Sequence, residues 1–343
     1  MVKVGVLGIG FMGTAHFKAY TAYRKAKVVA LSDLNPKRLS GDWSDIAGNI
    51  EGSQAATADL SKIHLHATPE DLLNDPDVEA VDITLPTFLH AKYTVAALEA
   101  GKHVICEKPM ACSLAECDKM IAAAKKAKRT LMIAHCIRFW PEYAKLKEIV
   151  DSKKYGKVLS ASFWRKSLTP TWSWDSWLMD EKRSGSAVLD LHIHDTDYVN
   201  FVFGVPKAVR STGVVGNVSN TGVDHIVTQY IYDDGPQVTA EGGWAMAPGF
   251  GFTAGFCVVC EKATIELGAK SEGKLTVYTA AGKTLTPKVA KGDGYINELR
   301  YFVDCVDAGK APAVVTAQDA RRAVAVCLAE ARSTKTGKTV KIN

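Results

Sequence analysis

The sequence has 343 residues, which is longer than one compact core usually needs and suits two domains. Hydrophobic residues make up 47% of it, but no run of about 18 apolar residues occurs, so a membrane-spanning protein is not expected. A formal charge of +5 is small and spread along the chain, so neither nucleic acid nor a membrane surface is an expected partner.

The N-terminus and the cysteines indicate a reducing compartment. Met1 to Leu7 follow a strand pattern and lack the regions of a signal peptide, so we expect a cytoplasmic protein. Eight cysteines without a regular framework are typical of buried, reduced thiols. Cys257 and Cys260 have a CxxC spacing, but no second pair accompanies them and strand alternation turns them to opposite faces, so no metal site is predicted.

Residues 1–134 are predicted to form a dinucleotide-binding domain of α/β class. Short apolar runs alternate there with amphipathic segments, as in a parallel sheet with crossover helices. Thr68 followed by Pro69, and Ser113 followed by Glu116, have the spacing of helix starts. The predicted strands are Val2–Leu7, Lys27–Leu31, Ala80–Thr84, His103–Cys106 and Leu131–Ala134.

Residues 135–343 are predicted to form a second, α+β domain. Strands that follow one another without helices imply a large, mostly antiparallel sheet. The predicted strands are Val158–Arg165, Val209–Val215, His225–Tyr232, Gln237–Gly243, Phe256–Cys260, Ala263–Leu267 and Leu275–Thr279. Helices are predicted over Ala187–Phe203, Tyr295–Ala308 and Gln318–Arg332.

A glycine-rich turn directly follows the first strand and precedes a helix. Its sequence is Gly8-Ile-Gly10-Phe11-Met12-Gly13. The first glycine permits a tight turn, the second lets a pyrophosphate approach the backbone, and the third lets the helix pack on the strand. The helix N-terminus adds free N–H groups, so the turn predicts a dinucleotide site.

The cofactor is predicted from Asp33, which lies 20 residues after Gly13 at the end of the next strand. Its carboxylate would accept hydrogen bonds from the ribose hydroxyls and repel the 2′-phosphate of NADP. NAD is therefore the expected cofactor. Lys37 and Arg38 follow within a turn and could reach a phosphate, which leaves NADP as the alternative.

Two further pairs of side chains are candidates for chemistry. Glu107 and Lys108 follow a strand at the edge where open sheets bind ligands, although such a pair is also common on solvated loops. Asp190 and His194 are spaced i, i+4 and would share one helix face, where the carboxylate raises the basicity of the imidazole. That pair suits a general base acting on an alcohol, and no metal-binding spacing accompanies it.

Together these stretches resemble the Gfo/Idh/MocA family, to which glucose-fructose oxidoreductase and inositol dehydrogenase belong. The resemblance covers the whole chain and rests on Gly8-x-Gly10-x-x-Gly13-x-x-His16, Thr84-Leu85-Pro86-Thr-Phe-Leu-His90, Glu107-Lys108-Pro109, Arg138-Phe139-x-Pro141 and Asp190-x-x-x-His194-Asp195. It implies a Rossmann domain, a C-terminal domain with an open sheet that binds substrate, and a homodimer or homotetramer built on that sheet.

The resemblance also implies roles for individual residues. Lys108, Asp190 and His194 correspond to the catalytic residues of the family, and whether Lys108 or His194 holds the proton stays open because the two would be coupled. Cofactor contacts are expected from Gly8, Gly10, Phe11, Met12, Gly13, Asp33, Leu85, Pro86, His90, Glu107 and Lys108.

Substrate contacts are expected from Lys108, Asp190, His194 and three further residues. Trp172 and Trp174 offer aromatic faces on which a sugar ring could stack, although packing explains such a cluster equally. Arg138 suits either a polar substrate group or a salt bridge.

The expected function is that of an NAD-dependent dehydrogenase or reductase acting on a sugar, a sugar derivative or a cyclitol. One alternative is an enzyme that retains NAD and cleaves a glycosidic bond through transient oxidation. The other is a dinucleotide-binding regulator without catalysis, for which the proton-transfer set would be unnecessary.

Overall fold

The chain divides into two compact units, and the structure, a computed structural model, describes residues 1–48 and 57–342. Unit 1 comprises residues 1–136 and 295–321, and unit 2 comprises residues 137–294 and 322–343. Among the described residues, no helix combines the length and the hydropathy needed to cross a membrane.

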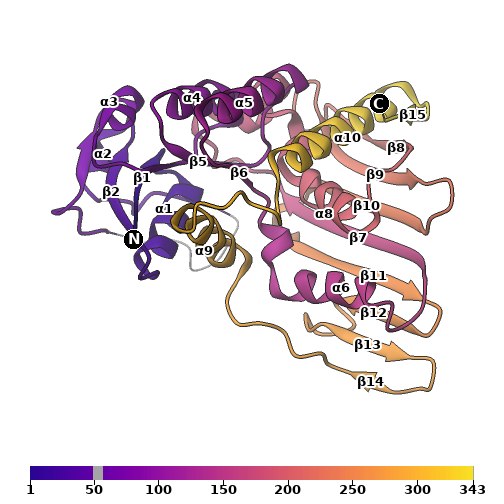
Figure 1. Cartoon of the computed structure of the whole chain (residues 1–343). Coiled ribbons are helices and arrows are strands. Elements are labelled where there is room, and N and C mark those ends of the chain that lie inside the picture. The colour runs from indigo at the N-terminus through magenta and orange to yellow at the C-terminus, as the bar shows by residue number, and fades with distance from the viewer. Residues whose placement is uncertain (49–56, 343) are drawn as a thin grey trace. The chain divides into compact units, whose positions relative to one another are not determined.

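Unit 1 is built on a parallel sheet of the Rossmann type (Figure 1). The described strands lie in the order β3-β2-β1-β4-β5-β6, so the order reverses between β1 and β4. Ligands of open α/β sheets bind beyond the carboxyl ends of the strands at such a reversal. This sheet confirms the predicted fold class, although β3 is not predicted. The strands are β1 (Val2–Leu7), β2 (Ala26–Ser32), β3 (His64–His66), β4 (Ala80–Ile83), β5 (His103–Glu107) and β6 (Leu131–Ala134).

Two helices of unit 1, α3 and α5, begin at the predicted caps. The Thr68 hydroxyl accepts the backbone N–H of Asp71, and the Ser113 hydroxyl accepts that of Glu116, so each satisfies a free donor of its helix. The helices are α1 (Phe11–Thr21), α2 (Pro36–Leu39), α3 (Pro69–Asn74), α4 (Thr87–Glu99), α5 (Leu114–Ala127) and, much later in the chain, α9 (Gly294–Asp307).

Helix α9 packs in unit 1 although residues 137–294 of unit 2 precede it. Asp304 accepts hydrogen bonds from the Tyr23 hydroxyl and the Lys25 ammonium, both just after α1, and Figure 1 shows α9 beside α1. The predicted division at residue 134 is close to the first boundary. The assignment of residues 295–321 to the second domain is wrong, because contacts this distant in sequence leave no local signal.

Unit 2 contains a nine-stranded, mostly antiparallel sheet, as predicted. Its central strand β7 pairs in parallel with β10 and antiparallel with β11, and the strand order is β14-β13-β12-β11-β7-β10-β9-β8-β15. The strands are β7 (Val158–Leu168), β8 (Ala208–Val215), β9 (Val223–Ile231), β10 (Gln237–Met246), β11 (Thr253–Cys260), β12 (Ala263–Leu267), β13 (Thr276–Thr279), β14 (Thr284–Leu285) and β15 (Val340–Lys341).

Helices of unit 2 cover one face of this sheet (Figure 1). The Thr196 hydroxyl bonds to Tyr230 of β9 and to Glu330, and the Tyr198 hydroxyl donates to a backbone carbonyl of α6, so these helices meet over a buried core. The helices are α6 (Pro141–Asp151), α7 (Glu181–Ser184), α8 (Ile193–Phe203) and the part of α10 (Ala317–Thr336) that follows Arg321.

The segment predicted as one helix over residues 187–203 has two parts. Val188–His192 forms a π-helix, and α8 continues from Ile193. A π turn is wider than an α turn and occurs frequently at functional sites. The prediction of a helix is confirmed, but the i, i+4 geometry assumed for Asp190 and His194 is corrected, because the π turn and α8 join between them.

Candidate active site

The glycine-rich turn of unit 1 has the shape that a dinucleotide requires. Gly8 has a φ of +96°, which side chains disfavour, and a Cβ on Gly13 would lie 2.0 Å from the Gly8 carbonyl oxygen. A Cβ on Gly10, in contrast, would meet no atom within 4 Å. Phe11 and Met12 are half-buried in the first turn of α1. The open space at Gly10 and the start of α1 therefore suit a pyrophosphate.

Asp33 follows β2, and hydrogen bonds hold its carboxylate beside this turn. One carboxylate oxygen accepts the backbone N–H of Ile9 at 2.7 Å, and the other accepts that of Asn35 at 2.8 Å. Each oxygen retains a lone pair for a further donor. The half-buried carboxylate is thereby oriented as an acceptor for ribose hydroxyls.

The two cations that follow Asp33 are already paired. Lys37 lies 3.1 Å from a carboxylate oxygen of Asp45, and Arg38 donates hydrogen bonds to both oxygens of the same group. The bonds from Arg38, then those from Lys37, hold the pKa of Asp45 well below its usual range. Because both cations face a carboxylate, the geometry favours NAD over NADP.

The loop after β4 borders the turn. The Thr84 hydroxyl donates to the Gly8 carbonyl at 2.6 Å, and the following Leu85 and Pro86 are half-buried. These two residues lie directly beyond the carboxyl end of β4. They remain suitable for contact with the cofactor.

His90, which was expected to contact the cofactor, lies instead in the interior of unit 1. Its Nδ1 is 2.8 Å from the Pro109 carbonyl oxygen, and its Nε2 is 2.8 Å from that of Leu85. Burial, the largest influence, lowers the pKa of His90. A neutral ring can donate to one of these two carbonyl groups, so His90 serves to position the loops, and its contact with the cofactor stays a prediction.

Glu107 and Lys108 differ in their surroundings. The Glu107 carboxylate is buried at the end of β5, where it accepts the backbone N–H of Lys108 and lies 3.2 Å from Nε2 of His16. Lys108 is half-buried at the carboxyl end of this strand. The Glu107 carboxylate therefore also serves to position its neighbours, its contact with the cofactor stays a prediction, and Lys108 remains a candidate for chemistry.

His16 connects the glycine-rich turn to these residues. Its Nδ1 lies 2.9 Å from Asp82 of β4, its Nε2 faces Glu107, and Glu298 of α9 lies in the same buried group. Burial lowers the pKa of His16, but the charges of Asp82 and Glu107 outweigh it and raise the pKa well above its usual value. His16 stands three residues after Gly13 in the motif that carries the family resemblance, but no role is predicted for it from the sequence.

In unit 2, the titratable side chains of residues 188–197 fall into two groups. His192, Asp195 and Asp197 are fully buried, whereas Asp190 and His194 are half-buried. Asp190 lies in the π turn and His194 in the first turn of α8. Asp190 and His194 are thus the members of this stretch that solvent or a substrate can reach.

Two buried ion pairs hold α8, the helix that contains His194, in place. Arg165 of β7 donates to both oxygens of Asp195, at 3.0 and 3.3 Å, and Arg138 donates to both oxygens of Asp197, at 2.8 and 2.6 Å. Arg138 is only 5% exposed. Of the two roles left open for Arg138, its geometry favours the salt bridge over contact with a substrate.

The tryptophan-rich segment before the π turn contains both exposed and packed rings. Trp174 is 65% exposed, and Trp172 is half-buried. Trp177 packs against the buried core formed by Leu178 and Trp244. Trp174 therefore has the most exposed of these rings, with the Arg183 guanidinium 5.9 Å from its centroid, while Trp177 serves packing.

The cysteines form no disulfide among the residues that the structure describes. All eight are free thiols. Cys257 and Cys260 lie three residues apart on β11, one half-buried and one buried, as expected for side chains on opposite faces of a strand.

Comparison with known proteins identifies relatives of both units. Residues 2–135 match a family described as "Oxidoreductase family, NAD-binding Rossmann fold", and residues 143–266 match the "GFO/IDH/MocA C-terminal domain". Unit 1 thus carries an NAD-binding Rossmann domain.

Two relatives align over nearly the whole chain. Inositol 2-dehydrogenase of Salmonella typhimurium is 28% identical over 98% of this chain and 96% of its own length. The scyllo-inositol 2-dehydrogenase (NAD(+)) of Bacillus subtilis is 28% identical over 100% of this chain and 96% of its own length. A solved structure of levoglucosan dehydrogenase, in complex with NADH and levoglucosan, shares the fold with a TM-score of 0.84, at 23% identity over 99% of each chain.

Proposed function

Because the chain belongs to the GFO/IDH/MocA family of oxidoreductases, we propose that it transfers hydride between NAD and a hydroxyl-bearing carbon of a sugar, sugar derivative or cyclitol. Relatives that align over nearly the full chain are named as inositol dehydrogenases, which supports this substrate class. The NAD preference is supported by the oriented carboxylate of Asp33 and by the paired state of Lys37 and Arg38.

The observation that carries the proposal is the selective exposure of Asp190 and His194. Their titratable neighbours in residues 188–197 are buried, and Asp195 and Asp197 are neutralised by arginines. A half-buried imidazole and a half-buried carboxylate in the same short stretch are suited to proton transfer. A protein that bound dinucleotide without catalysis would not need this pair.

The proposed roles follow from the chemistry of each side chain. His194 takes the hydroxyl proton of the substrate on a ring nitrogen, and Asp190 orients His194 and accepts a hydrogen bond from a neighbouring hydroxyl. Lys108 donates a hydrogen bond to the reacting oxygen and stabilises its negative charge. Bound NAD supplies the acceptor for the hydride that leaves the same carbon.

The decisive experiment measures NADH formation by the full-length protein with a panel of sugars and cyclitols. We expect net NADH formation with at least one substrate, and a higher kcat/KM with NAD than with NADP. Glycoside cleavage without net NADH formation would instead support the NAD-retaining alternative. Dinucleotide binding with neither reaction would support the regulator and contradict the proposal.

Variants then test the residue roles. Lys108→Ala and His194→Ala should each lower kcat by about 100- to 10,000-fold, the usual contribution of acid–base catalysis, while the Kd for NAD stays near that of the wild type. Lys119→Ala, a change on the exposed side of α5, is the matched control and should retain full turnover. Unchanged turnover in Lys108→Ala or His194→Ala would remove that residue from the mechanism.

A further inference from the structure

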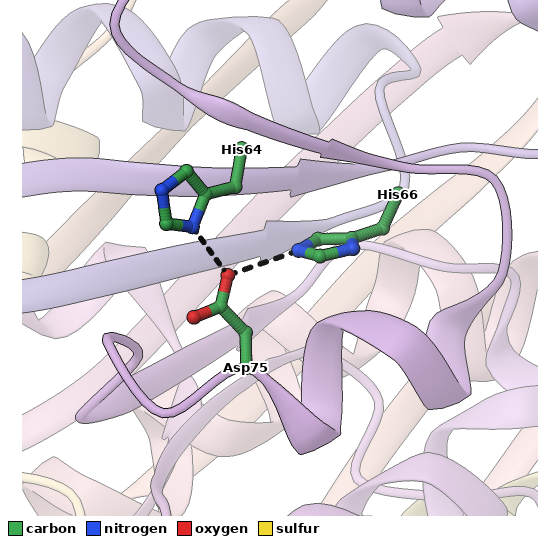
Figure 2. A group of neighbouring side chains, drawn as sticks. All are labelled: His64, His66 and Asp75. Atoms are coloured by element: carbon green, nitrogen blue, oxygen red, sulfur yellow. Dashed lines mark hydrogen bonds and ion pairs between the residues drawn. The ribbon is translucent and has the colours of Figure 1, made fainter.

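Two histidines and an aspartate converge in unit 1, outside the residues considered so far (Figure 2). His64 and His66 belong to the edge strand β3, and Asp75 directly follows α3. Nδ1 of His64 lies 2.7 Å, and Nε2 of His66 lies 3.0 Å, from the same carboxylate oxygen of Asp75. Three possible ligand atoms thus meet at one point.

The strand geometry explains why both imidazoles reach this point. Side chains two residues apart in a strand leave the sheet on the same face. The rings of His64 and His66 lie 6.4 Å apart, nearly perpendicular, and Figure 2 shows Asp75 between them. Helix α3 packs against β1, β2 and β3, so Asp75, which directly follows α3, comes within hydrogen-bond distance of both rings.

The carboxylate of Asp75 is held in a fixed orientation. Asp75 is 5% exposed, and its second oxygen accepts the backbone N–H of Asp77 at 2.8 Å. The Lys102 ammonium donates to the backbone carbonyls of Asp75 and Val78, so it anchors this connection without a bond to the carboxylate. Hydrogen bonds that orient a ligand in this way are typical of metal sites.

We propose that His64, His66 and Asp75 form a binding site for a divalent transition metal ion, with Zn²⁺ as the representative. One ligand atom from each residue lies within 4.8 Å of the others. Ligands of tetrahedral zinc, bound at about 2.0 to 2.1 Å, lie about 3.3 Å apart, so the two contacts need to lengthen by only about half an ångström. Two imidazoles and one carboxylate favour zinc, nickel or copper over magnesium and calcium.

The surroundings leave room for the ion and for a fourth ligand. The His64 side chain is 54% exposed and that of His66 is 21% exposed, so an ion can enter from solvent and keep a water molecule. The other group of possible ligands in the described residues, His16, Glu107 and Glu298, is fully buried, and His16 is already paired with Asp82. That group is better explained as a closed cluster of charges.

The residues of this site are not among those proposed for the dehydrogenase reaction. Asp75 lies on the connection that enters β4 at its amino end, whereas His66 pairs with Ser32, directly before Asp33. A bound ion would link β3 to the connection between α3 and β4. Calorimetry measures metal binding without a turnover assay, so a failure of this proposal can be distinguished from a failure of the proposed function.

The test uses the full-length chain without an affinity tag, freed of metal by a chelator and titrated with Zn²⁺ by calorimetry. We expect one equivalent to bind to the wild type. His64→Ala and His66→Ala each remove one ligand of the ion. Each should weaken Zn²⁺ binding by at least about 10- to 100-fold, because the loss of a residue that only orients a ligand already costs that much. Asp77→Asn is the matched control, because Asp77 is an adjacent carboxylate that pairs with Lys3, and it should retain the affinity.

Spectroscopy with Co²⁺ identifies the ligands. Nitrogen and oxygen ligands should give visible bands without the intense thiolate charge-transfer absorption that cysteine ligands produce. Thiolate absorption, no binding to the wild type, or equal binding by the double variant of His64 and His66 would each overturn the proposal. His64 is largely exposed and His66 is not, so circular dichroism verifies the fold of each variant before titration.

Discussion

At the scale of single residues, Gly10 and Gly13 perform different tasks three positions apart. A Cβ on Gly13 would collide with the Gly8 carbonyl, whereas a Cβ on Gly10 would point into open space. Gly10 also has a φ of −92°, which alanine adopts without strain. Gly13 therefore serves the fold, whereas Gly10 leaves open space for a ligand.

We expect Gly10→Ala to fold normally but to bind NAD weakly. Its free energy of unfolding should stay within about 0.5 kcal/mol of the wild type, as for a change without new contacts. The new methyl group should weaken NAD binding by about tenfold or more, because it occupies the approach of the pyrophosphate. Urea unfolding and NAD titration measure the two quantities.

Gly13→Ala is the companion variant and should lose about 1 to 3 kcal/mol of stability through overpacking. If Gly10→Ala bound NAD as the wild type does, the assignment of the pyrophosphate to this turn would be wrong.

The exposed and packed tryptophans give a second prediction at this scale. Trp174→Ala should raise the KM for the sugar or cyclitol by about 3- to 10-fold at unchanged kcat, since stacking on an aromatic ring contributes about 0.5 to 1.5 kcal/mol. Trp177→Ala should instead lower stability by about 2 to 3 kcal/mol, because Trp177 packs on the core. An unchanged KM in Trp174→Ala would show that this ring does not contact the substrate.

Individual residues differ in how well the sequence predicts them. The glycines and Asp33 could be predicted because their roles depend on a local turn and a fixed offset along the chain. The inward directions of Glu107 and His90 could not, because they depend on His16 and Pro109, which come from other elements. The local sequence pattern does not show which way a loop side chain points when its partner is distant in the sequence.

At the scale of elements, the buried cluster around His16 joins α1, β4, β5 and α9. Burial raises the pKa of Glu107, but the contact with His16 outweighs it and lowers the pKa below its usual value. The pKa of His16 is raised. Glu298 lies within the group, and Tyr20 adjoins it through Asp82. The cluster therefore stabilises unit 1 as a charged group.

These shifts predict a pH window for stability. The contribution of His16, whose folded pKa is raised, is complete below its unfolded pKa and is lost as pH rises through the folded pKa. The contribution of Glu107, whose folded pKa is lowered, is complete above its unfolded pKa and is lost as pH falls. Both are present between about pH 4.5 and 6.5.

We expect His16→Asn to destabilise the protein most in this window, by about 3 kcal/mol, because it leaves buried carboxylates without their cation. The free energy of unfolding, measured with urea, should differ less between His16→Asn and the wild type as the pH rises further. His103, whose pKa burial lowers, provides the control: His103→Asn should give the opposite trend with pH. A difference for His16→Asn that does not vary with pH would mean that His16 is neutral in the folded protein.

Some elements left no readable signal in the sequence. β3 has three residues, two of them histidines, so no apolar run marks it, and only pairing with β2 makes it a strand. The π turn escaped prediction because hydrophobic periodicity cannot separate it from an α turn over five residues. The longer strands of both sheets could be predicted, because each carries its own apolar pattern.

At the scale of the whole molecule, the face of the nine-stranded sheet opposite α8 is partly apolar. Val227 is 42% exposed there, and the neighbouring strands add Trp164 and the ion pair of Lys166 with Glu241. Apolar side chains on such a face favour contact with a second copy, whose identical surface is self-complementary about a two-fold axis. We expect a homodimer or homotetramer through this face.

Light scattering coupled to gel filtration tests the expected assembly. Val227→Lys should shift the wild-type oligomer to monomer, because a charge would be buried in the contact. Val205→Lys is the matched control, since Val205 is equally exposed but lies in the loop after α8. A monomeric wild type, or an oligomer unaffected by Val227→Lys, would contradict an interface on this face.

The discontinuity of unit 1 has a consequence for the order in which the chain folds during synthesis. When residue 136 leaves the ribosome, Tyr23 still lacks Asp304 and the His16 cluster still lacks Glu298, and both arrive only after residues 137–294 have been translated. Domains generally fold from the N-terminus onward as they emerge. Here the dinucleotide-binding unit is begun first and completed almost last, so a nascent chain that stalls before residue 295 carries an unfinished cofactor domain.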